Sequence, residues 1–133
     1  GFCGETENDH KETLKLMKEI GFDYAYMFKY SERPNTFAAR NLDDDVSEEI
    51  KSRRLSEIIE LQSKLSLESN KKDLGKTFEV LVEGISKKSD KQVHGRNSQY
   101  KVFIFDGDKS MIGKLIKVKV VKYSQATLFG EAI

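Results

Sequence analysis

The residues with the clearest chemical potential are basic and cluster in the second half of the chain. The cluster consists of Lys87, Lys88, Lys91, His94, Arg96, Asn97, Tyr100 and Lys101. Lysine and arginine side chains that contact phosphates release counterions, which gives salt-dependent affinity for many sequences of nucleic acid. We therefore expect this stretch to contact nucleic acid.

Aromatic residues close to the basic cluster favour the same interpretation. Tyr100, Phe103 and Tyr123 could stack on unpaired bases, at roughly 1–3 kcal/mol per base. The alternative is that Phe103 and Phe105 divide between a core and a surface. Likewise, the alternating Lys117 and Lys119 are also consistent with an ordinary solvated strand face.

Residues suited to enzymatic chemistry are sparse. Cys3 is the only cysteine, and His10 and His94 are too far apart in sequence to form a ligand motif. Asp43, Asp44 and Asp45 are best interpreted as a solvated linker. Asp106-Gly107-Asp108 begins like a calcium loop but lacks the later glycine and glutamate, so a tight turn is favoured. We predict no catalytic residue and no metal site here.

The charge distribution divides the chain of 133 residues into two parts. Residues 1–70 hold 10 Lys and Arg against 15 Asp and Glu, whereas residues 71–133 hold 13 against 7. This asymmetry indicates two parts with different roles, the basic one suited to an acidic partner. No apolar run is long enough to span a membrane, so no membrane partner is expected. The single cysteine suggests a reducing, cytoplasmic location.

The first expected element is a helix over residues 6–20. Thr6 can cap its start, although Asp9 stands where a capping box carries Glu or Gln, which makes the box imperfect. Leu14, Met17 and Ile20, together with Thr13, recur at helical spacing and predict the buried stripe. Gly21 follows in the position favoured for a helix stop.

Residues 23–30 alternate strictly and predict a strand. Tyr24, Tyr26, Phe28 and Tyr30 share one face. A strand that follows a helix and a glycine turn forms half of a βαβ unit, which needs partner strands. Residues 1–40 are therefore expected to belong to a larger parallel sheet or barrel.

A second, longer helix is expected from Ser47 to about residue 69. Its predicted apolar stripe is irregular and consists of Ile50, Leu55, Ile58, Ile59, Leu61 and Leu65. Charged residues of the same helix, Arg53, Arg54, Glu57 and Glu60, are interpreted as a solvated face with local pairs.

From Gly75 onward the hydrophobic pattern changes from helical to strand periodicity. Alternating or apolar runs lie at 78–82, 102–105, 116–121 and 126–132, with glycine-containing turns between them. Four or five short strands in so few residues predict a small antiparallel barrel. Closure of the barrel would also remove exposed edge strands.

Several separated motifs resemble, in order, the C-terminal part of the MiaB-type tRNA methylthiotransferases, which are radical-SAM enzymes. They are Gly-Phe-Cys-Gly-Glu-Thr at 1–6, the segment 26–39, Arg54-Leu55, and Gly-Lys-Thr-Phe-Glu-Val-Leu-Val-Glu-Gly at 75–84. Gly95-Arg96, Val102–Asp106, Ile112–Lys114 and Leu128–Glu131 resemble the TRAM domain that ends this family. The resemblance implies an α+β fragment: the end of a radical-SAM α/β barrel at 1–45, a linking helix at 46–71, and a five-stranded, OB-like TRAM barrel at 72–133.

The resemblance also implies a reaction that this stretch of chain cannot perform alone. Such enzymes methylthiolate carbon 2 of an N6-isopentenyladenosine beside the tRNA anticodon. They use S-adenosylmethionine and two 4Fe–4S clusters, one of them held by a Cys-x3-Cys-x2-Cys motif. These 133 residues contain neither cysteine set, and Cys3 stands where the family usually has proline. We therefore predict an inactive fragment whose partners are the anticodon stem-loop of tRNA and the remainder of the enzyme.

By resemblance, two further places are expected to lie near the reaction. Gly4, Glu5 and Thr6 match a loop close to the S-adenosylmethionine site, although they could simply turn the chain and cap the first helix. Arg33 matches the end of the last barrel strand, where the active sites of such barrels lie, and is expected on the substrate side. Its alternative is a structural turn with an ion pair. Asn35 replaces the usual glycine of this turn and tolerates positive φ.

Other functions remain open at this point. Relatives that modify a ribosomal protein have Tyr-Ser-x-Glu-Glu-Gly-Thr at the turn, so Arg33-Pro34 favours the tRNA branch. The branch that acts on threonylcarbamoyladenosine in tRNA usually keeps the arginine but has a less similar C-terminal domain. A stand-alone RNA-binding or adaptor module is the alternative outside enzymes.

Overall fold

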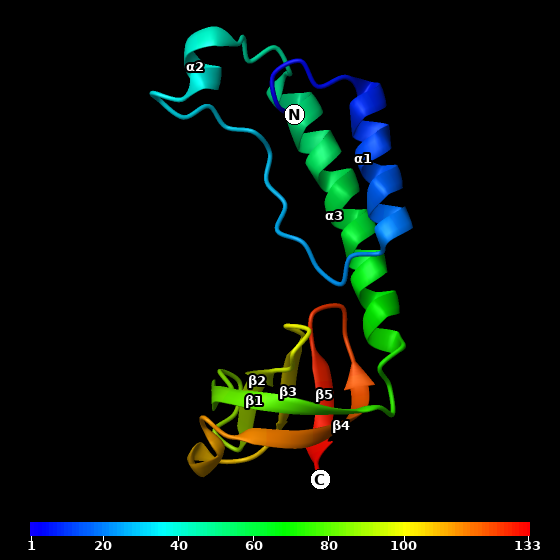
Figure 1. The fold of residues 1–133 in the computed structure, drawn as a ribbon, viewed down its shortest axis with the longest axis vertical. Coiled ribbons are helices and arrows are strands. Elements are labelled where there is room, and N and C mark those ends of the chain that lie inside the picture. The colour runs from blue at the N-terminus through cyan, green and yellow to red at the C-terminus, as the bar shows by residue number, and fades with distance from the viewer. The chain divides into compact units, whose positions relative to one another are not determined.

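The computed structural model describes all residues, 1–133, and divides into two compact units, Gly1–Leu65 and Ser66–Ile133 (Figure 1). The helices are α1 (Glu7–Ile20), α2 (Phe37–Asn41) and α3 (Glu48–Lys71), the last of which crosses the boundary. The strands are β1 (Thr77–Ile85), β2 (Gln92–Arg96), β3 (Val102–Asp106), β4 (Leu115–Tyr123) and β5 (Leu128–Ala132), with a short 3₁₀ helix, η1 (Lys109–Met111). No helix has the length and apolar character that crossing a bilayer requires.

Helix α1 starts and ends where the sequence predicts. The Thr6 hydroxyl accepts a hydrogen bond from the Asp9 backbone N–H at 3.2 Å, and the Asp9 carboxylate accepts from the Thr6 backbone N–H at 2.8 Å. The capping box is therefore complete, and the expectation that Asp9 would leave it imperfect was wrong. Gly21 ends the helix in the left-handed region, with φ of 66°.

The buried face of α1 differs in part from the predicted stripe. Met17 is buried as expected, but Ile20 is more than half exposed, and the other fully buried residue is His10. The His10 ring nitrogen Nε2 lies 2.7 Å from the Glu57 carboxylate of α3, and Figure 1 shows α1 alongside the first part of α3. A carboxylate across the helix pair therefore allows a polar side chain outside the predicted stripe to be buried.

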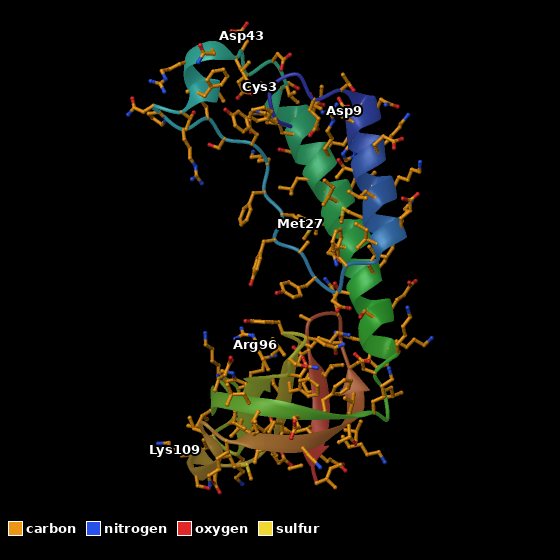
Figure 2. All side chains as sticks on the ribbon, in the orientation of Figure 1. Cys3, Asp9, Met27, Asp43, Arg96 and Lys109 are labelled. Carbon is orange, nitrogen blue, oxygen red and sulfur yellow. The ribbon has the colours of Figure 1, made fainter.

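Residues 23–30 do not form the predicted strand. Exposed and half-buried residues still alternate along this segment: Tyr26 and Phe28 are 84% and 85% exposed, whereas Ala25 and Met27 are half-buried. Met27, labelled in Figure 2, lies on the side of this segment that faces α3. Strand structure requires hydrogen bonds to a neighbouring strand, and the unit Gly1–Leu65 contains no other strand. The segment is therefore extended but unpaired.

The turn after this segment is as expected. Asn35 adopts a φ of 67°, which confirms that it can replace glycine there. Thr36 then caps the short helix α2, which the sequence analysis missed, by accepting a hydrogen bond from the Ala39 backbone N–H at 3.2 Å.

Helix α3 begins after Ser47, whose hydroxyl accepts from the Ile50 backbone N–H at 3.3 Å. Its buried face is polar rather than apolar. Lys51 and Arg54 are buried, whereas Ile50 and Ile59 from the predicted apolar stripe are exposed. Interpreting Arg54 as part of a solvated face was therefore wrong. The physical reason is that carboxylates outside α3 pair with these cations and compensate for their burial.

The second unit is a closed five-stranded barrel with the strand order β1-β2-β3-β5-β4 (Figure 1). This confirms the predicted OB-like barrel. One detail needs correction: all neighbours are antiparallel except β3 and β5, which are parallel. Parallel pairing arises because β4 lies between them in sequence and runs back along the barrel, so that β5 enters from the same end as β3. The separate strand β2 was also missed.

Alternating inward side chains fill the barrel. The core consists of Val80, Val82, Val93, Phe103, Phe105, Val118, Val120 and Leu128. Phe103 is fully buried, which excludes it as a base-stacking residue and corrects that expectation. Gly95 and Gly130 also lie at inward positions, where a Cβ atom would overlap the Leu81 carbonyl group or a Val118 methyl group. Small residues at these two places allow the strands to approach closely.

Candidate nucleic-acid interface

The loop between β1 and β2 presents its lysines to solvent. The Ser86 side chain is buried, and its hydroxyl accepts a hydrogen bond from the Lys88 backbone N–H at 3.3 Å. The Ser89 hydroxyl likewise accepts a hydrogen bond from the Lys91 backbone N–H at 3.2 Å. These local bonds satisfy backbone donors inside the loop. The side chains of Lys87, Lys88 and Lys91 are all exposed, as an interface for phosphates requires.

His94 lies on the outward face of β2 beside this loop. Its ring packs over Gly84 of β1, where a Cβ atom would lie 3.0 Å from Nε2. Its Nδ1 atom lies 3.7 Å from the Glu83 carboxylate, so a protonated imidazole has a charge partner there. The histidine is therefore held in place while part of its ring stays accessible.

Arg96, labelled in Figure 2, shares the same carboxylate. One guanidinium nitrogen donates to both Glu83 oxygens, at 2.9 Å and 2.8 Å. Arg96 is exposed, so this is a weak surface ion pair in which the Glu83 carboxylate balances the charge of the guanidinium.

The structure does not place Lys101 and Asn97 at the surface. Lys101 is 8% exposed, and its ammonium group donates to the Asp73 carboxylate at 2.6 Å and to the Ser69 hydroxyl at 2.8 Å. Asn97 is also buried, and its side-chain oxygen accepts from the Gln99 and Lys101 backbone N–H groups. Both residues shape the β2–β3 turn, so we withdraw them as expected RNA contacts.

Tyr100 remains an accessible aromatic residue at the tip of the same turn. It is 69% exposed and adopts a φ of 62°, which non-glycine residues rarely do. Tyr123, by contrast, packs against the barrel core. Of the aromatic residues that the sequence pattern suggested for stacking, only Tyr100 projects fully into solvent.

In the first unit, Gly4, Glu5 and Thr6 each form hydrogen bonds with other residues of the same unit. The Gly4 backbone N–H donates to the Asp45 carboxylate at 2.7 Å, and Arg54 donates to the Glu5 carboxylate at 2.6 Å. Thr6 caps α1. These contacts match the structural alternative for the three residues.

Arg33 is placed differently. Its carbonyl group accepts from Thr36, but its guanidinium forms no ion pair in the structure. It lines a hollow of about 390 Å³ together with Phe2, Tyr30 and Thr36. The alternative of a turn held by an Arg33 ion pair therefore finds no support.

The acidic runs have structural roles. Asp108 caps η1, and hydrogen bonds from the Ser110 side chain and backbone hold the pKa of its carboxyl below the usual value. Asp106 accepts a hydrogen bond from Gln92 at 3.2 Å. Asp44 pairs with buried Lys51 at 2.6 Å. No group of three or more His, Cys, Asp or Glu side chains is arranged to hold a metal ion.

Sequence reasoning missed two outward residues next to the basic loop. Ile104 of β3 and Phe129 of β5 face away from the core, half-buried and adjacent across the parallel ladder. The alternation of inward and outward residues could have indicated them. Ile104 lies between the buried Phe103 and Phe105, and Phe129 follows the buried Leu128. The register that brings the two together could not be read from sequence.

Comparison with known proteins agrees with this architecture. The family model of the TRAM domain matches residues 71–133. Over 133 residues the chain is 59% identical to the tRNA-2-methylthio-N(6)-dimethylallyladenosine synthase of Parabacteroides distasonis. It is 56% identical to the enzymes of that name from Phocaeicola vulgatus and Porphyromonas gingivalis strain W83.

These matches cover the entire chain but only 29% of each relative. They confirm the resemblance that the separated motifs indicate. Residues 71–133 therefore form a TRAM domain, and the whole chain is similar to about 29% of the length of the tRNA-2-methylthio-N(6)-dimethylallyladenosine synthases that it matches.

Proposed function

We propose that this chain is part of an enzyme that methylthiolates carbon 2 of N6-dimethylallyladenosine in tRNA, and that its barrel binds the tRNA near the anticodon. The observation that carries the proposal is the 59% identity to a synthase of that name over 133 residues. A cytoplasmic location belongs to the same proposal, because tRNA is the substrate.

The proposal assigns no cluster chemistry to this part of the enzyme. The resemblance implies S-adenosylmethionine and two 4Fe–4S clusters, but the chain has one cysteine, Cys3, and no grouped metal ligands. The residues present do not fit a cluster site. They are suited to binding and positioning RNA, with Arg33 as a proposed contact on the substrate side.

The exposed lysines of the β1–β2 loop support the RNA-binding role. Lys87, Lys88 and Lys91 project from a loop held by its own serines, and no ion pair is formed by any of them. Their positive charge is thus available to phosphates, which also gives the interface its salt dependence.

A binding titration tests this role directly. The chain is titrated against a fluorescent tRNA anticodon stem-loop at several salt concentrations, and the slope of log Kd against log salt is measured. Replacing Lys87, Lys88 and Lys91 by alanine should weaken binding and reduce the slope by about 0.7–0.9 for each phosphate that is no longer neutralised.

The matched control removes the same charge elsewhere. Lys11, Lys15 and Lys18 of α1 are equally exposed, and their replacement by alanine should leave the slope unchanged. If both triple variants lost the same amount of affinity and of salt slope, only the net charge of the chain would matter, and the loop would be rejected as the interface. Preferential competition by a ribosomal protein would instead favour the alternative substrate.

The enzymatic part needs the complete protein. With its clusters reconstituted and S-adenosylmethionine supplied, it should convert N6-dimethylallyladenosine in tRNA to the 2-methylthio nucleoside, as detected by mass spectrometry of the digested tRNA. The triple loop variant should raise KM for tRNA more than it lowers kcat. No product from the unaltered enzyme would reject the proposed reaction.

A further inference from the structure

One row of outward side chains crosses four neighbouring strands of the barrel. The strand register pairs His94 of β2 with Ile104 of β3, and Ile104 with Phe129 of β5. Phe129 is in turn paired with Lys122 of β4. The four side chains therefore form a continuous band on one outer face of the sheet, which we call the His94–Lys122 row.

The centre of this row is apolar and hollowed. Ile104 and Phe129 are half-buried, and Val102 lies two positions along β3 on the same face. Ile104 and Val102 line a hollow of about 250 Å³ on the β2 side of Phe129, together with Ser86, Lys87, Lys88 and His94. This is smaller than the roughly 300–1,000 Å³ of pockets that enclose drug-sized ligands, and it suits a single flat ring.

Cations lie at both ends of the row. Lys87 and Lys88 border the hollow at the β2 end. At the β4 end the Lys122 ammonium lies 5.8 Å from the centre of the Phe129 ring. Two acidic residues share these outward faces: Asp106 accepts a hydrogen bond from Gln92, and Glu131 lies opposite Lys119 in the strand register. A flat apolar centre between cations is complementary to a base with phosphates on either side.

A second groove on the barrel has the opposite electrostatic character. It has a volume of about 590 Å³ and is lined by Leu81, Leu115 and Tyr100, but also by Glu79 and Glu83. Arg96, the basic residue that lines it, is paired with Glu83. The carboxylates disfavour a phosphate backbone there, so the two faces can be distinguished by experiment.

We infer that the His94–Lys122 row is a stacking platform for one unpaired nucleotide of RNA, with the base against Phe129 and Ile104 and the flanking phosphates on Lys87, Lys88 and Lys122. The inference rests on the proposed RNA-binding function and makes it more specific. Base faces in a duplex are covered by neighbouring bases, so the platform selects single-stranded or loop segments over paired ones.

A tryptophan reporter tests the platform, because the chain contains no tryptophan of its own. The Phe129→Trp variant is titrated with single-stranded oligouridine and with a blunt adenine–uracil RNA duplex that contains the same number of nucleotides. Its emission should be quenched saturably by the single strand and much less by the duplex. The matched control is Leu115→Trp, at a 66% exposed position in the second groove, whose emission should stay unchanged.

An affinity measurement accompanies the fluorescence experiment. Phe129→Ala should weaken oligouridine binding about 5- to 100-fold, the range expected when one base loses its stacking partner, without changing the salt slope. Circular dichroism of the same sample establishes that this variant folds. If it does not fold, the Phe129→Trp titration decides by itself.

The outcomes separate this inference from the function on which it rests. Quenching of Leu115→Trp but not of Phe129→Trp would overturn the platform and place the base in the second groove. If the loop-lysine variants reduce tRNA binding while neither tryptophan responds, RNA binding stands and the platform is wrong. If no RNA binds the unaltered chain, both the platform and the proposed RNA-binding role of the barrel are rejected.

Discussion

The interiors of the two units contain different kinds of side chain. The barrel buries eight apolar residues, none more than 1% exposed. The unit Gly1–Leu65 buries only Met17 and Val46 among its apolar residues, together with charged Lys51 and Arg54. Its large aromatic residues Tyr26 and Phe28 are instead exposed.

The difference follows from how each unit provides hydrogen-bond partners for its backbone groups and carboxylate partners for its buried cations. A closed sheet pairs all of its strands internally, so every inward position can be apolar. In the first unit the extended segment 23–30 has no strand partner, and buried cations must each find a carboxylate. We therefore expect the barrel to depend on packing and the first unit on ion pairs.

The largest effect expected from this comparison is that of Phe103→Ala. The side chain is fully buried, and its removal should cost the barrel about 3–5 kcal/mol of unfolding free energy. The matched control is Phe28→Ala, at an 85% exposed position in the first unit, with an expected change of within about 0.5 kcal/mol. Denaturant unfolding with hydrogen exchange resolved by region measures both, and equal losses would contradict the comparison.

Two adjacent arginines of α3 give an intermediate effect. Arg54 is buried and donates to the Glu5 carboxylate at 2.6 Å, whereas Arg53 is exposed and pairs with Glu7 at the same distance. Arg54→Met should destabilise the first unit by about 1.5–3 kcal/mol, and Arg53→Met should have a much smaller effect because solvent screens its ion pair. Hydrogen exchange of the α1 amides distinguishes them. A larger loss for Arg53→Met would show that burial does not decide the strength of these pairs.

The smallest expected effect is a pH dependence of the stability of the first unit. Hydrogen bonds from Arg53 lower the pKa of Glu7, and bonds from His10 and then Arg53 lower that of Glu57, each from an ordinary value of 4.5. A carboxyl whose pKa is lower in the folded state stabilises the fold above its ordinary value, and this contribution is lost as pH falls through the folded pKa.

Hydrogen exchange as a function of pH tests this expectation. Protection of α1 should be constant above about pH 4.5 and decline below it, whereas protection of the barrel core should decline less over the same window. The Glu57→Gln variant, which keeps the shape but not the charge, should flatten the α1 profile. An equal decline in both units would remove the electrostatic distinction between them.

Much of the fold was predictable because its signals are local. Thr6, Ser47 and Gly21 mark helix ends through bonds within a few residues, and the alternation from residue 77 onward marks strands by their period of two. The candidate interface was predictable in part. Lys87, Lys88 and Lys91 are exposed as expected, because charged loop residues between strands have little else to contact.

The errors about which polar residues are buried concern partners that are distant in sequence. Lys101 was expected at the surface, but Asp73 holds it inside at 2.6 Å. His10 and Arg54 are buried because the carboxylates of Glu57 and Glu5, more than forty residues away in sequence, form hydrogen bonds with them. No local pattern contains that information.

By itself, the sequence determined where α1, α3 and most of the barrel strands form, which segment carries the positive charge, and which family the chain resembles. Only the tertiary structure decided that β3 and β5 pair in parallel. The register of the barrel strands then places His94, Ile104, Phe129 and Lys122 side by side in one row. The physical reason is that alternation fixes which residues share a face of one strand. Which residues meet across strands depends on pairing, and pairing is set by closure of the whole barrel.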